Sequence, residues 1–182
     1  MINTVFLDMD GVIADFHKGI YDAFRQPYRY DESLATWDFW DNWKPPLNRE
    51  NINAKCSVYF WEHLPWTHDG LEIFEIVCSK FKPEQIHILT NPIVGGAGTA
   101  TGKILWIEKY LPEFVKRVII TQAPKGLLAK PDTLLIDDNN NYVDGFREAG
   151  GKALLVPRPW NRAHLQAGQT VKVVRKFLER VC

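Results

Sequence analysis

The sequence lacks the features that define several common classes of protein. Only three of its 182 residues are cysteines, and none form a Cys-x-x-Cys pair, which argues against a disulfide framework and favours a reducing, cytoplasmic setting. The five histidines show no zinc-ligand spacing. No apolar run is long enough to cross a membrane, and the first residues do not have the pattern of a signal peptide. We therefore expect no membrane partner.

The chain also lacks an excess of either charge. Lys and Arg together number 22, as do Asp and Glu, so no broad basic surface for duplex nucleic acid is expected. A hydrophobic content of 46% and a charged content of 24% are typical of a globular protein, and the length suits one domain with a small appendage. The sequence does not specify the oligomeric state and leaves a homodimer open.

Short apolar runs alternate with amphipathic segments along most of the chain. This alternation predicts an α/β fold with a mostly parallel, five-stranded sheet flanked by helices. The expected strands are residues 3–8, 85–89, 117–121, 133–137 and 152–156. The expected helices are residues 15–25, 69–81 with Asp69 as N-cap, 102–110, 140–149, and a final amphipathic helix over 171–181.

Residues 26–68 differ in composition from the rest of the chain. They are rich in proline, asparagine and aromatic residues, they contain five of the seven tryptophans, and they show no strand pattern. We interpret this part as a small helical cap inserted after the first strand. The predicted division is a catalytic core formed by residues 1–15 and 69–182, and a cap formed by residues 16–68.

The first expected strand ends in two carboxylates one residue apart, Asp8 and Asp10, followed by Gly11. Side chains alternate along a strand, so both carboxylates leave it on the same side. Two like charges this close disfavour each other unless a cation lies between them, and carboxylates are ligands that Mg²⁺ prefers. An alternative is an Asp-Gly turn with both carboxylates in solvent.

Two further expected strands end in polar side chains. One ends in Thr90 and Asn91, the other in Asp137 and Asp138, and Lys125 lies between them in the sequence. Because the carboxyl ends of parallel strands meet at one edge of an open sheet, we expect these groups to form one site. The alternative for the two aspartates is that they only cap the helix beginning at residue 140.

These motifs resemble the haloacid dehalogenase (HAD) superfamily of phosphohydrolases and, within it, the 5′(3′)-deoxyribonucleotidase family. The resemblance covers residues 5–160 and rests on residues 8–16, 88–92, 106–110 and 135–138 and on Lys125. The Asp-Met-Asp-Gly-Val run is its most specific part. Asn91 stands where the family pattern has serine, a change that keeps a donor for phosphate. The resemblance implies a Rossmann-like HAD core.

The resemblance also implies roles for the acidic residues. Asp8 would be the nucleophile that forms an aspartyl-phosphate, and Asp10 the general acid and base. Mg²⁺ would be held by Asp8, by the backbone carbonyl of Asp10 and by Asp138, with Asp137 behind it or paired with the lysine. The sequence leaves the order of Asp137 and Asp138 open.

Basic and polar groups would hold the phosphate. Lys125 is favoured as the cation that neutralises the transferring phosphoryl group, with Lys130 as its rival. Thr90 and Asn91 would donate hydrogen bonds to phosphate oxygens. Lys103 has two equal interpretations, as a phosphate contact or as a solvated lysine.

Aromatic side chains near the cap are candidates for stacking on a nucleobase. Phe16 matches a substrate-contacting position of the family, and Phe39, Trp40, Tyr59 and Phe60 come from the aromatic-rich stretch. For any single aromatic residue the alternative is packing in the core of the cap.

The function that follows is Mg²⁺-dependent hydrolysis of nucleoside 5′-monophosphates, with deoxyribonucleotides favoured. One alternative is a phosphatase for another small phosphoester, and a non-catalytic nucleotide-binding module is a third interpretation. A different class is a P-loop kinase or NTPase, because residues 97–103 approximate a P-loop. Ile104 opposes it, since that position should carry the Ser or Thr that holds Mg²⁺.

Overall fold

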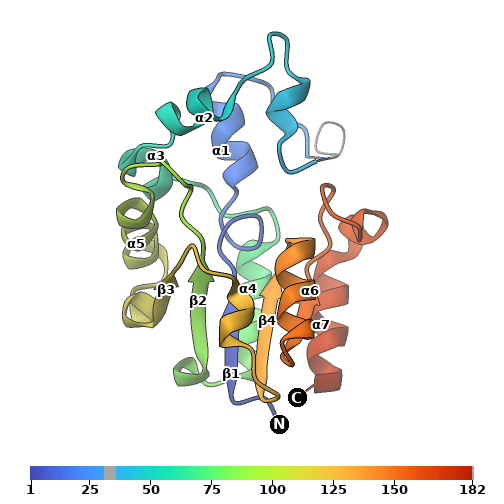
Figure 1. Cartoon of the computed structure of the whole chain (residues 1–182). Helices are drawn as coiled ribbons and strands as arrows, with labels where there is room; N and C mark the ends of the chain where they lie inside the picture. The colour runs from blue at the N-terminus through green and yellow to red at the C-terminus, as the bar shows by residue number, and fades with distance from the viewer. Residues whose placement is uncertain (31–35, 182) are drawn as a thin grey trace.

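The computed structural model describes residues 1–30 and 36–181, and its centre is a five-stranded parallel sheet. The strand order is β3-β2-β1-β4-β5 (Figure 1). The strands are β1 (Thr4–Leu7), β2 (Ile86–Thr90), β3 (Val118–Ile120), β4 (Thr133–Asp137) and β5 (Lys152–Leu155). The predicted α/β fold with five parallel strands is confirmed, and each strand lies within about one residue of its expected bounds.

The three central strands are almost entirely apolar because both faces of the sheet are covered. Val5 of β1 lies opposite Ile86 of β2 and Leu134 of β4, and all three are fully buried. A parallel sheet covered on both faces favours such continuous apolar runs over alternating ones.

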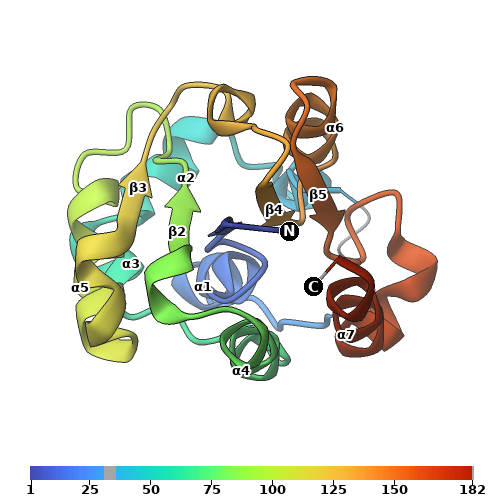
Figure 2. The same cartoon turned by 90° about the horizontal axis from the view of Figure 1, so that it is seen from below.

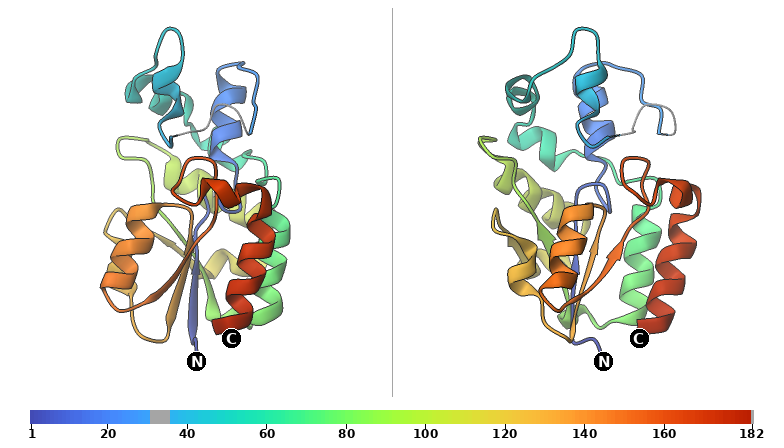
Figure 3. Two further views of the ribbon diagram at one scale, coloured as in Figure 1. Left: turned by 90° about the vertical axis from the view of Figure 1, so that its right-hand side faces the viewer. Right: turned by 45° about the vertical axis from the view of Figure 1, so that its right-hand side comes forward.

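Helices cover both faces of the sheet. Helix α6 packs on one face, and α4 and α7 lie side by side on the other (Figures 2 and 3). The four core helices are α4 (Gly70–Lys80), α5 (Thr99–Tyr110), α6 (Asn140–Glu148) and α7 (Thr170–Val181). Short 3₁₀ turns are η2 (Pro83–Gln85), η3 (Pro112–Arg117), η4 (Lys125–Leu128) and η5 (His164–Gln169). Among the described residues, no helix combines the length and apolarity needed to span a membrane.

The helix predicted over 140–149 begins at Asn140 as expected, whereas the predicted N-cap of the helix over 69–81 makes no capping bond. The N-cap of α6 is Asn139, whose side chain accepts hydrogen bonds from the backbone N–H groups of Asn141 and Tyr142. Asp137 and Asp138 therefore do not serve as this cap. Asp69 does precede α4 but makes no capping bond, because its carboxylate is bound to the buried guanidinium of Arg158 at 2.7 Å.

The segment between β1 and α4 lies beyond the carboxyl ends of the strands (Figure 1). It contains α1 (Phe16–Ala23), η1 (Phe39–Asn42), α2 (Arg49–Lys55) and α3 (Val58–Glu62). Residues 31–35 of the predicted cap lie outside the described residues. Buried side chains of this segment, such as Ile20 and Trp61, belong to the same hydrophobic cluster as Val5 and Trp106 of the core. Cap and core therefore share one interior.

The strand order places a topological switch at the centre of the sheet. After β1 the chain adds β2 and β3 on one side and then returns to the other side of β1 with β4 and β5. In open α/β sheets, ligands bind outside the carboxyl ends of the strands at such a switch point. Asp8, Asp137 and Asp138 stand at this point.

Candidate active site

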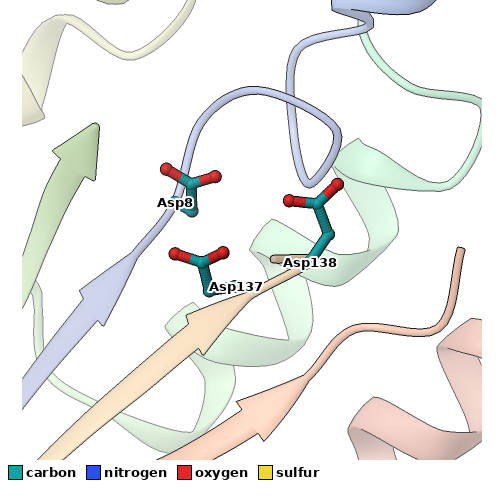
Figure 4. Close-up of side chains that lie close together, drawn as sticks. All are labelled: Asp8, Asp137 and Asp138. Atoms are coloured by element: carbon teal, nitrogen blue, oxygen red, sulfur yellow. The ribbon is translucent and has the colours of Figure 1, made fainter. Parts of the chain in front are cut away.

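Three carboxylates meet at the carboxyl ends of β1 and β4. Asp8 follows β1, Asp137 ends β4, and Asp138 comes directly after it (Figure 4). One carboxylate oxygen from each lies within 4.8 Å of the others, and all three residues are buried. Residues far apart in the sequence are thus brought together as the sequence predicted.

Hydrogen bonds distinguish the three carboxylates. Both oxygens of Asp137 are engaged, one by the Lys125 ammonium at 2.6 Å and one by the backbone N–H of Asn139 at 2.8 Å. Asp8 uses one oxygen to accept from Lys125 at 2.7 Å, and Asp138 uses one to accept from the indole N–H of Trp160 at 2.5 Å.

The second oxygens of Asp8 and Asp138 can therefore face a cation. Ligands on opposite sides of an Mg²⁺ ion are about 4.2 Å apart, since each Mg–O distance is about 2.1 Å. Buried carboxylate oxygens within 4.8 Å of one another fit an ion of that kind. The bonds of Asp137 suit a partner of the lysine better than a direct ligand.

Lys125 lies between two of the acids. Its ammonium bridges Asp8 and Asp137, and its side chain is almost completely buried. Burial opposes the charged form, but the carboxylates of Asp137 and Asp8 outweigh it and raise the pKa of Lys125. Lys130, the rival candidate, is exposed. Lys125 is thus the lysine that the fold brings to the cluster.

A second buried lysine, Lys103 of α5, is paired with the other motif carboxylate. Its ammonium binds the Asp10 carboxylate and donates to the Thr90 hydroxyl and the Asn91 carbonyl, both at 2.7 Å. The solvated alternative for Lys103 is wrong, because the side chain is fully buried. The signal for burial was helical spacing, since Trp106 and Ile107, three and four residues later, are buried on the same face.

Burial raises the pKa of several carboxyl groups, and neighbouring carboxylates add to the rise. For Asp138 burial is the main cause, followed by the charges of Asp137 and Asp8. For Asp137 burial raises the pKa to about 6, with Lys125 opposing and Asp8 adding to the rise. For Asp10 burial raises the pKa, Lys103 opposes it, and Asp8 adds to the rise. A site that resists carrying all these negative charges favours a cation.

The two predicted phosphate donors have partners within the protein. The Thr90 hydroxyl accepts from Lys103, which leaves its own hydrogen free to donate. The Asn91 amide donates to the Thr121 carbonyl at 2.6 Å and so anchors the end of β2 to the segment after β3. Asn91 also lines the cavity described next.

A cavity of about 230 Å³ extends from the acidic cluster to the cap segment. This volume is just below the ~300–1,000 Å³ typical of ligand pockets, so the cavity suits a small molecule. Its floor includes Asp8, Asp10 and Asp138. Its upper wall is mainly aromatic and aliphatic, with Asp38, Arg49 and Asn53 as polar members; the other residues of this wall are Phe16, Trp37, Trp40, Ile52, Trp61, Ile93 and Val94.

Two of the five predicted substrate contacts, Phe16 and Trp40, line this cavity. Phe60 does not, and its ring packs edge-to-face on Phe16 and Trp61. Phe39 does not, because its ring is buried against Tyr21, stacked at 4.9 Å between centroids. Tyr59 does not either, since it is 69% exposed and stacks on His63. Composition identified the aromatic segment, but it could not separate lining rings from core or surface rings.

The P-loop interpretation of residues 97–103 is wrong. In a P-loop the lysine reaches phosphates held by the loop that precedes it. Here the Lys103 ammonium points to Asp10, Thr90 and the Asn91 carbonyl instead.

Two solved structures are similar to this chain in fold. A haloacid dehalogenase-like hydrolase from Bacteroides fragilis, described as putative, matches with a TM-score of 0.53 and 15% identity over 84% of this chain and 86% of its own. L-2-haloacid dehalogenase from Xanthobacter autotrophicus matches with a TM-score of 0.51 and 16% identity, over 98% and 88%. The protein therefore has the HAD-like fold.

Comparison of the sequence with family models identifies the family within this fold class. A family model described as "5′ nucleotidase, deoxy (Pyrimidine), cytosolic type C protein" matches residues 1–173, so the chain belongs to this family. The family predicted from the motifs is confirmed, as is the predicted HAD-like fold.

The individual relatives have low sequence identity to this chain. Human mitochondrial 5′(3′)-deoxyribonucleotidase is 29% identical over 74% of this chain, which corresponds to 61% of the human protein's length. The human cytosolic type is 28% identical, over 75% of this chain and 70% of that protein. A Bordetella bronchiseptica protein named as a putative 5′(3′)-deoxyribonucleotidase is 26% identical, over 87% and 85%.

Proposed function

We propose that the protein hydrolyses deoxyribonucleoside 5′-monophosphates in an Mg²⁺-dependent reaction through an aspartyl-phosphate on Asp8. The observation that carries this proposal is the buried cluster of Asp8, Asp137 and Asp138 beside Lys125, of which Asp8 and Asp138 line the floor of a cavity with an aromatic wall. Membership of the 5′ nucleotidase family supports the same reaction.

The cation would be held by the second oxygens of Asp8 and Asp138 and by the backbone carbonyl of Asp10. When bound, Mg²⁺ neutralises charge on the phosphoryl oxygens and orients them. Asp137 would contribute indirectly, because it fixes Lys125 against Asp8.

In the first step the Asp8 carboxylate attacks phosphorus, and the bond to the nucleoside oxygen breaks. Asp10 gives its proton to that leaving oxygen, for which its raised pKa is suited. Lys125, paired with Asp8, lies where it can offset charge on the transferring group. The product of this step is a free nucleoside and an aspartyl-phosphate.

In the second step water attacks the phosphorus of the aspartyl-phosphate. Asp10, now ionised, takes the proton from the water, and the Asp8 carboxylate leaves as inorganic phosphate forms. Lys103 holds the Asp10 side chain for both proton transfers. One carboxyl group therefore serves as acid and then as base.

The cap segment would bind the nucleoside. The rings of Phe16, Trp37, Trp40 and Trp61 face the cavity, and aromatic stacking contributes about 1–3 kcal/mol per base. A cytoplasmic setting and a homodimer remain predictions; relatives named above include both cytosolic and mitochondrial types.

A phosphate-release assay tests this proposal. Deoxyribonucleoside 5′-monophosphates, ribonucleotides and sugar phosphates would be compared with Mg²⁺ and with EDTA. We expect the deoxyribonucleotides to be cleaved fastest and EDTA to stop the reaction reversibly. Asp8→Asn should abolish turnover, whereas Asp22→Asn, on the exposed side of α1, should leave it unchanged.

Two results would contradict the proposal in different ways. Full activity in EDTA would exclude the cation's role. Equal rates for deoxyribonucleotides and sugar phosphates would exclude recognition of the nucleoside by the aromatic wall and favour a phosphatase for another small ester.

A further inference from the structure

Trp160 follows β5 and touches the acidic cluster. Its indole N–H donates to one oxygen of Asp138 at 2.5 Å, and the side chain is buried at 9% exposure. Neither the proposed reaction steps nor the proposed binding of the nucleoside uses this residue. It is nevertheless the side-chain donor that holds the carboxylate proposed as a cation ligand.

Gly11 and Asn161 also pack against Asp138. A Cβ atom at Gly11 would lie 2.3 Å from the Asp138 oxygen and 3.0 Å from the Trp160 ring, so only glycine fits against this pair. The Asn161 amide donates to the Asp138 backbone carbonyl at 2.8 Å and to the Val156 carbonyl at 2.8 Å. Adjacent residues thus hold both the side chain and the backbone of Asp138.

The same segment also holds the loop after β1. The buried guanidinium of Arg158 donates to the carbonyl of Gly11 at 2.6 Å and to that of Val12 at 3.2 Å. Residues 158–161 therefore set the loop that follows Asp8 and Asp10 against Asp138.

The face of the Trp160 ring has a separate contact. It stacks on the His17 ring of α1, with 3.9 Å between centroids and planes inclined by 25°. Burial lowers the pKa of His17 to about 3, so the imidazole is neutral near pH 7. The ring is thus fixed by the first helix of the cap while its edge holds Asp138.

The charge of the donor distinguishes Asp138 from the other acids. Asp8 and Asp137 are bound to the ammonium of Lys125, and Asp10 to that of Lys103. Asp138 is held by a neutral N–H, which orients the carboxylate without adding a positive charge beside it. Partners behind a ligand that fix its orientation commonly change metal affinity 10- to 100-fold when they are removed.

We propose that Trp160 is a positioning residue for the cation site: it holds one oxygen of Asp138 so that the other faces the ion. This inference rests on the proposed function, because it takes Asp138 as a direct ligand. It adds that the cation affinity depends on an indole N–H anchored to the cap.

Replacement of the indole by a ring without the donor tests the proposal. Trp160→Phe keeps an aromatic ring against His17 and removes the N–H. Affinity would be measured with Mn²⁺ as probe, from the free-ion signal in electron paramagnetic resonance, with Mg²⁺ as competitor. We expect the dissociation constant of Trp160→Phe to rise about 10- to 100-fold.

The matched control is Trp106→Phe. Trp106 is also buried and also loses an indole hydrogen bond, to the Leu64 carbonyl at 2.8 Å, but it does not touch the acidic cluster. It should bind Mn²⁺ as the wild type does. Trp160→His is the rescue variant, because the histidine Nε2–H can occupy the place of the indole N–H, and it should bind more tightly than Trp160→Phe.

Four results would overturn the proposal. Trp160→Phe could bind Mn²⁺ like the wild type, or Trp106→Phe could lose as much affinity. Circular dichroism will show whether Trp160→Phe folds. If it does not, Trp160→His decides: a folded variant with the affinity of the wild type would support the proposal, and a folded variant with a 10-fold loss of affinity would contradict it. A wild type that binds no Mn²⁺ would overturn the proposed function as well, which separates the two failures.

Discussion

At the scale of the residue, the site is a set of buried charges that compensate one another. Lys125 is shared by Asp8 and Asp137, and Lys103 is bound to Asp10. An unpaired buried charge would be strongly destabilising, so each lysine makes a carboxylate possible at its position. The fold itself thus depends on the groups that the reaction would use.

Replacing Lys125 tests its predicted role. Lys125→Met removes the positive charge beside Asp8 at nearly constant side-chain length, and we expect turnover to fall by about 10²- to 10³-fold, as for loss of one preorganised electrostatic contact. Steady-state kinetics of phosphate release measure the effect, and circular dichroism verifies the fold.

Lys130→Met is the control for that experiment. Lys130 is exposed and lies five residues further along the chain, so its replacement should leave turnover unchanged. A loss of activity in Lys130→Met with none in Lys125→Met would reverse the assignment of the two lysines.

The sequence could predict residues whose position follows from a strand end. Asp8, Asp137 and Asp138 each stand at or just after the carboxyl end of a buried strand, and parallel strands bring such ends together. It could not predict Trp160 or Arg158, since their contacts are made across more than 20 residues of chain by a segment without regular structure. For Lys103 the sequence could predict burial, from its place on a helix face, but not its contact with Asp10.

At the scale of the element, close packing of α3 on α5 brings the cap to the core. Gly102 of α5 lies under α3, where an added Cβ would be 2.5 Å from the Cβ of Trp61 and 2.6 Å from the carbonyl oxygen of Val58. The same two helices carry Trp61 of the cavity wall and Lys103 beside Asp10. The close packing of α3 on α5 therefore determines how far the cap lies from the acidic cluster.

Glycine-to-alanine changes in two helices test this packing. Alanine within a helix is favoured over glycine by about 0.5–1 kcal/mol. Gly145→Ala in α6, where the added Cβ meets nothing within 4 Å, should raise the free energy of unfolding by that amount. Gly102→Ala should instead lower it by about 1–3 kcal/mol, because α3 must shift.

Urea denaturation of both variants measures these changes. A Gly102→Ala protein as stable as Gly145→Ala would show that α3 does not press on α5. The element boundaries behind this test were largely predictable, since apolar periodicity located all five strands and the core helices. The capping contacts were less so: Asp69 has the residue type of an N-cap, but Arg158 competes for its carboxylate.

At the scale of the whole molecule, the acidic edge of the sheet and the aromatic segment above it enclose one cavity. The sequence predicted both parts and their order along the chain. It could not show that they share a single hydrophobic interior, because that depends on how rings such as Trp61 and Trp106 pack in three dimensions. The predicted division between cap and core, at residues 15 and 69, therefore describes the order of segments along the chain and not two separate interiors. It remains a prediction.

Trapping the phosphorylated enzyme tests the central claim most directly. The protein would be mixed with a deoxyribonucleoside 5′-monophosphate and Mg²⁺, quenched in acid during turnover and reduced with borohydride, which converts an acyl phosphate to an alcohol. Mass spectrometry should then find homoserine at position 8 and aspartate at positions 10, 137 and 138. Product formation with an unmodified Asp8, or with the modification at another aspartate, would contradict the account.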